Sequence, residues 1–109
     1  MASASVQVSG QGAEQLAREL QAVLRSNAAS ADSVSPVEVD RSAELVIAVI
    51  GLVFAGVDAA KTIWDWWQSR RSTGVTVKIL LDDGAQVDLS GVDREQLQLE
   101  FGRRAKRER

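Results

Sequence analysis

The sequence predicts an α+β fold, in which a small sheet of about four strands carries two packing helices and one long hydrophobic central helix. Three observations lead to this prediction. Residues 42–71 contain the longest apolar run of the chain. Residues 13–26 repeat apolar side chains at helical spacing, and residues 75–89 alternate apolar and polar side chains around an Asp-Gly turn.

The first third of the chain predicts a strand, a helix and a second strand. Val6 and Val8 alternate with polar residues, which is typical of a short strand. Residues 13–26 are expected to form an amphipathic helix that packs on the sheet. Residues 27–35 are small and polar and predict a connector. Residues 37–40 alternate again, which predicts a short strand at an edge of the sheet.

The central segment, residues 42–71, predicts one long helix. Ser42 is a suitable N-cap, and Arg70 and Arg71 suit the C-terminal end of the helix dipole. Its uncharged run of 13 residues, 45–57, is shorter than the roughly 20 residues that an independent membrane span needs. Three interpretations stay open: a core helix laid on the sheet, a helix inserted in a membrane as part of an assembly, and a helix lying on a membrane surface.

One face of this predicted helix carries small and polar residues at alternating steps of three and four. The face comprises Ala48, Gly51, Ala55, Asp58, Thr62 and Asp65. Small residues at this period let two helices approach closely, so the pattern predicts an oligomerisation stripe. The alternative for its charged end is an ordinary surface pair between Asp58 and Lys61.

An aromatic and basic cluster ends the predicted helix. It comprises Trp64, Trp66, Trp67, Arg70 and Arg71. Tryptophans followed by arginines are typical of a membrane interface, so we interpret the cluster as a membrane-interface anchor. Packing of the tryptophans in the core is the alternative interpretation.

The last third of the chain predicts a hairpin and a helix within a single domain, residues 1–102. Asp83 and Gly84 form the turn between the two strands. Asp93 and Gln96 form a capping box that starts a short helix, which we expect to end at Gly102.

Residues 103–109 are strongly basic and predict a solvated C-terminal tail. Its residues Arg103, Arg104, Lys106 and Arg107 suit a protease specific for arginine or lysine, so we interpret the tail as a possible cleavage segment. The alternative is a disordered tail with a general attraction to anionic lipid.

Composition excludes several classes of function. The 109 residues include neither His nor Cys, which removes disulfides, thiol nucleophiles and histidine bases. We expect no enzyme activity, no cofactor and no metal site. The formal net charge of −2 argues against nucleic-acid binding. The N-terminus does not resemble a signal peptide, so we expect a cytoplasmic protein.

The order of motifs from the central segment onward resembles a known family. A hydrophobic segment of small residues leads into the tryptophans and arginines, and then into the sequence VTVKILLDDGAQVDLSGVD. This order is similar to that of the effector-associated constant components of actinobacteria. The resemblance covers residues 6–101 and is strongest over residues 51–93. It implies a non-catalytic component of bacterial antiphage or conflict systems, encoded near trypsin-like or caspase-like peptidases.

Two functional hypotheses follow from the residues and the resemblance together. In the first, the protein self-associates and acts at the inner membrane, as a pore-forming effector that a partner protease activates. Its partners would be further copies of the chain, bacterial membrane lipid and that protease, without nucleic acid. In the second, the protein is a soluble adaptor that recruits an effector or protease without touching a membrane.

Overall fold

The structure is a computed structural model that describes residues 2–27, 33–41, 46–70 and 74–107. Its strands are β1 (Ala2–Ser9), β2 (Ser33–Val34), β3 (Glu38–Asp40), β4 (Ile47–Phe54), β5 (Thr76–Leu81) and β6 (Gln86–Asp88). Its helices are α1 (Ala13–Asn27), α2 (Asp58–Gln68) and α3 (Arg94–Arg107). The predicted α+β class is confirmed.

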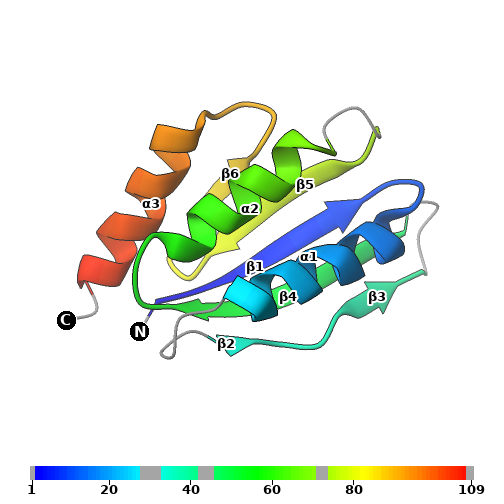
Figure 1. Cartoon of the computed structure of the whole chain (residues 1–109), viewed down its shortest axis with the longest axis horizontal. Coiled ribbons are helices and arrows are strands. Elements are labelled where there is room, and N and C mark those ends of the chain that lie inside the picture. The colour runs from blue at the N-terminus through cyan, green and yellow to red at the C-terminus, as the bar shows by residue number, and fades with distance from the viewer. Residues whose placement is uncertain (1, 28–32, 42–45, 71–73, 108–109) are drawn as a thin grey trace.

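The six strands form one antiparallel sheet in the order β2-β4-β1-β5-β6, with β3 also paired to β4. Both β4 and β5 pair with β1 in antiparallel fashion, so α2 connects them by crossing over β1. All three helices lie on the same face of the sheet, and α2 packs between α1 and α3 (Figure 1). The molecule therefore has two layers, one of helices and one of strands.

The core lies between these layers. Alternate residues of β1, β4 and β5 are buried under the helices, as the two-residue period of a strand requires. At the end of β4, the ring of Phe54 stacks on that of Phe101 from α3, with 4.4 Å between centroids. This contact holds the middle of α3 against the sheet.

The prediction of one long helix over residues 42–71 is wrong. Residues 47–54 form β4, and the helix begins only at Asp58. An apolar run without charges satisfies a strand as well as a helix, and its β-branched residues favour the strand. Residues 42–45 and 71, including the expected cap at Ser42, lie outside the described residues. The sheet gains β4 and β2 over the four strands that were expected.

The C-terminal helix also runs further than the sequence suggested. α3 continues through Gly102 to Arg107, although residues 103–109 were expected to form a solvated tail. The physical reason is that Arg104 and Ala105 are buried, with 4% and 9% of their surface exposed. Packing of this last turn therefore outweighs the weak helix propensity of glycine.

Candidate functional site

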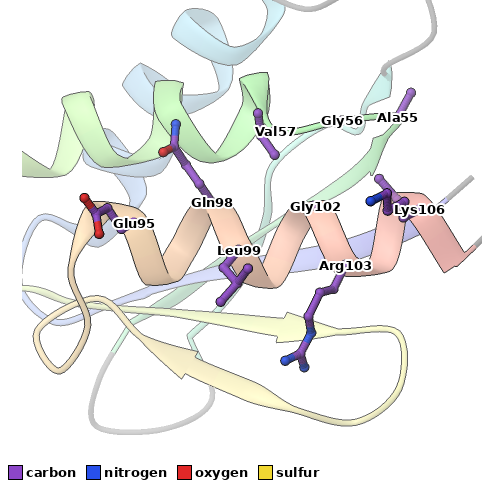
Figure 2. Close-up of a pocket in the computed structure, with 10 residues that line it drawn as sticks. Ala55, Gly56, Val57, Glu95, Gln98, Leu99, Gly102, Arg103 and Lys106 are labelled. Carbon is purple, nitrogen blue, oxygen red and sulfur yellow. The ribbon is translucent and has the colours of Figure 1, made fainter.

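An open groove of about 740 Å³ lies beside α3, where β4 leads into α2. The connection 55–57 forms one side, and one face of α3 forms the other (Figure 2). The groove is lined by Ala55, Gly56, Val57, Glu95, Gln98, Leu99, Gly102, Arg103, Ala105 and Lys106. Most of these side chains are apolar or small, so the groove has an apolar floor.

Gly102 allows α3 to approach the connection closely. A Cβ atom at this position would lie 3.2 Å from Cγ1 of Val57, which is tighter than ordinary contact. The glycine therefore seats the helix against Val57, and the groove opens beside this contact. This accounts for a glycine in the interior of a helix, where it is otherwise unfavourable by about 1 kcal/mol relative to alanine.

The groove exposes the two large apolar side chains that are most accessible among the described residues. Leu99 is 58% exposed and Val57 is 37% exposed. Leu97 and Phe101, which flank Leu99 on the helix, point into the core and are fully buried. Leu99 thus contributes nothing to the core and is free to contact another molecule.

Charges differ between the two ends of the groove. Arg103 and Lys106 are exposed near the C-terminal end of α3, and Glu95 is exposed in its first turn. Figure 2 shows Glu95 and Lys106 at opposite ends of the labelled part of the helix. Arg103 makes a long ion pair of 3.5 Å with Glu100, in which its side chain is still 56% exposed.

Arg104 fixes the position of α3 next to the groove. Its guanidinium lies 2.9 Å from the carboxylate of Asp83 in the β5–β6 turn and 3.0 Å from that of Glu100. Arg104 was expected in a protease-accessible tail. Its burial instead makes it a structural link between the hairpin and the last turns of the helix.

The residues of the predicted oligomerisation stripe do not share one helix. Ala48 and Gly51 lie on β4 and face opposite sides of the sheet. Ala55 lines the groove. Only the remaining three, Asp58, Thr62 and Asp65, lie on α2, where both aspartates are exposed. The structure therefore does not bring the six residues together, and oligomerisation itself stays a prediction.

The predicted membrane anchor is largely inside the molecule. Trp66 and Trp67 are each 4% exposed, and Trp64 is partly buried against the core. Arg70 pairs with Glu19 of α1 at 3.0 Å and lies 5.8 Å from the ring centroid of Trp66. α2 is an amphipathic helix, and the two buried tryptophans belong to the face that covers the core. Arg71 lies outside the described residues.

Sequence reasoning missed most of the residues that form the groove, above all Val57, Leu99 and Gly102. It had assigned other roles to the lining residues Ala55, Arg103 and Lys106. One signal was available, because Leu99 does not share the helical face of Leu97 and Phe101 and had no expected place in the core. The other half of the groove depends on where residues 55–57 lie in space. No local pattern encodes that position.

No helix in the described ranges is long and apolar enough to cross a membrane. No group of three or more acidic side chains within those ranges is placed to hold a metal ion.

Comparison with known proteins gives one family. No curated protein and no solved structure matches the chain. The model of the family named Effector Associated Constant Component 1 matches residues 8–103, a range that holds α1, α2, most of α3 and every strand except the greater part of β1. The match confirms the resemblance that we described from the motif order, and the family name describes components associated with effectors. This chain belongs to the Effector Associated Constant Component 1 family.

Proposed function

We propose that this protein is a non-catalytic adaptor of a bacterial conflict system, and that it binds an effector protein through the groove beside α3. The observation that carries the proposal is the exposure of Leu99 and Val57 in one concave apolar site. Exposed apolar side chains gathered in a groove are typical of protein-binding sites. The family name supports an effector as the partner.

The chemistry of the groove supports binding over catalysis. Its charged groups are Glu95, Arg103 and Lys106. Glu95 lies at the end of the groove away from the two cations, so the site has no carboxylate paired with a base or nucleophile. The effector class that we propose is the trypsin-like or caspase-like peptidase that the family resemblance implies.

The membrane hypothesis has lost the observations that motivated it. Ala48 and Gly51 are strand residues, and Trp66 and Trp67 are buried. Residues 103–107 belong to α3, so they are not part of the unstructured tail from which we inferred activation by a protease. Pore formation, lipid binding and activation by cleavage are therefore not part of the proposed function.

The proposal is tested by co-expression with a peptidase encoded beside the gene for this protein. Size-exclusion chromatography with light scattering measures the mass of the complex. We expect wild-type protein to co-elute with the peptidase, and Leu99→Glu to elute alone because a buried carboxylate opposes docking.

Gln96→Glu is the matched control, because it adds the same charge to an exposed position of α3 outside the groove. We expect this variant to bind like the wild type. Absence of a complex with wild-type protein would contradict the adaptor function, whereas equal binding by Leu99→Glu would show that the peptidase docks elsewhere.

A further inference from the structure

We infer that the groove binds an amphipathic helix of the partner, with apolar side chains at its centre and acidic side chains in its first turn. This inference deepens the proposed function and rests on it for the identity of the partner. The shape of the groove, its apolar floor and the charges at its two ends all favour such a helix.

The shape of the groove suits a helix. The lining residues of α3 recur at steps of three and four from Glu95 to Lys106, so the groove follows one face of the helix. Eleven residue steps at a rise of about 1.5 Å give a length of roughly 16 Å. A partner helix of about three turns has the same length and lies along such a face.

The apolar floor of the groove determines which side chains the partner helix carries at its centre. Leu99 and Val57 are exposed midway along the site, next to Gly56 and Gly102, which have no side chains. A leucine or similar side chain of the partner can therefore enter between them and bury apolar surface on both sides. Such central anchors provide most of the binding energy in helix-in-groove complexes.

The charges set the direction of the partner helix. Arg103 and Lys106 attract carboxylates to the end of the groove at the C-terminus of α3. Carboxylates are most favourable in the first turn of a helix, where they interact with its dipole. The partner helix therefore begins near Lys106 and runs antiparallel to α3, and a basic residue in its last turn faces Glu95.

A protein segment fits these features better than a lipid surface. The site is concave and exposes only two large apolar side chains among the described residues, Val57 and Leu99. A helix that lies in a membrane presents a broad convex apolar face. Anionic vesicles form a separate arm of the test.

The test uses the full chain, labelled with nitrogen-15, and two synthetic helical peptides. Both peptides carry leucines at helical spacing. One has glutamates in its first turn and a lysine in its last, and the other has these charges exchanged. We expect the acidic-start peptide to shift the amide resonances of residues 55–57 and 95–106, and the exchanged peptide to bind at least about tenfold more weakly.

A charge exchange in the protein makes the test specific. The double variant Arg103→Glu, Lys106→Glu is expected to reverse the preference between the two peptides. Arg94→Glu is the control, because it reverses a charge that is exposed on α3 outside the groove, and it is expected to keep the wild-type preference. Circular dichroism verifies that each variant keeps the fold.

Three results would overturn the inference: equal binding of both peptides, resonance shifts outside the groove, or binding of the wild type to anionic vesicles but to neither peptide. The outcome is separable from that of the adaptor function. Peptide binding without peptidase binding would contradict only the proposed partner, and peptidase binding that survives Leu99→Glu would contradict only the groove as its site.

Discussion

Arg104 of α3 and Asp83 of the β5–β6 turn form the ion pair that ties the C-terminal helix to the hairpin. The guanidinium Nη2 lies 2.9 Å from Oδ2 of Asp83, and the arginine side chain is only 4% exposed. Asp83 and Glu100 remain 32% and 19% exposed. The buried arginine is therefore neutralised from two elements, and the helix turn that borders the groove is held in place.

Arg104→Met is expected to lower the free energy of unfolding by about 1–3 kcal/mol, since it removes hydrogen bonds to two charged groups. The effect stays below the largest values for buried pairs because water reaches both carboxylates. Urea unfolding measures it. Arg103→Met is the control, since its exposed pair with Glu100 contributes at most about 1 kcal/mol. Equal loss of stability in both variants would contradict the structural role of Arg104.

Trp67→Ala is expected to destabilise the protein by about 3–5 kcal/mol, because the indole is buried in the core. Trp64→Ala is expected to cost less, since Trp64 is only partly buried. Chemical unfolding of both variants gives the comparison. A pair of near-neutral substitutions would instead agree with tryptophans that project from the molecule, as the membrane-anchor hypothesis required.

Gly51 and Ser35 are expected to show strong coupling. Ser35 Oγ accepts a hydrogen bond of 2.7 Å from the amide of Gly51, and a Cβ on residue 51 would lie 2.9 Å from the same oxygen. Gly51→Ala therefore displaces the hydroxyl and loses this bond. In a Ser35→Ala background nothing is lost, and alanine is favoured in a strand by about 0.5–1 kcal/mol.

A double-mutant cycle measures this coupling as the difference between the two Gly51→Ala effects. We expect about 1 kcal/mol, the usual net contribution of one hydrogen bond. If the effects of the two substitutions on stability were additive, residues 35 and 51 would not be in contact. In that case β2 and the residue after it would not lie beside β4 as described.

Ser90→Ala is expected to raise the pKa of Asp88. The Ser90 hydroxyl donates to Asp88 Oδ1 over 2.7 Å, and the Ser90 amide donates over 3.0 Å. These hydrogen bonds hold the pKa of Asp88 below its ordinary value, and the hydroxyl has the largest effect. A carboxyl with a lower pKa in the folded state adds stability at neutral pH, and this contribution is lost as the pH falls through the folded-state pKa.

Carboxyl carbon NMR follows the titration of Asp88 in both proteins. The stability difference between wild type and Ser90→Ala should be greatest at neutral pH and should shrink in acid, where Asp88 is protonated in both folded and unfolded chains. If the stability difference between the two proteins grew on acidification, the hydrogen bonds from Ser90 would not be what lowers the pKa of Asp88.

Local signals predicted the start of α3, which is set by a cap, and the β5–β6 hairpin, which is set by a turn. The Asp93 carboxylate accepts a hydrogen bond of 2.8 Å from the amide of Gln96, which is the cap expected at the start of α3. The hairpin pairs Lys78 with Asp88 and Ile79 with Val87, as its alternation and Asp-Gly turn indicated. In both places the information lies within a few residues of sequence.

The centre of the chain could not be assigned in this way. β4 has Ile47, Val49 and Val53 on the face away from the helices, where an alternating strand usually carries polar residues. With apolar side chains on both faces, the two-residue period disappears from the sequence. The groove was equally hidden, because it forms only when the connection after β4 meets a helix some forty residues later.

Backbone NMR of residues 46–68, without and with anionic vesicles, distinguishes the fold described here from one long membrane-associated helix. We predict strand chemical shifts for residues 47–54, helix shifts for residues 58–68, and a cross-strand contact between Val6 and Ile50 in both samples. Continuous helix shifts from residue 46 to residue 68 in either sample would contradict this fold. In that case β4, the connection to α2 and the groove beside α3 would not exist in that state.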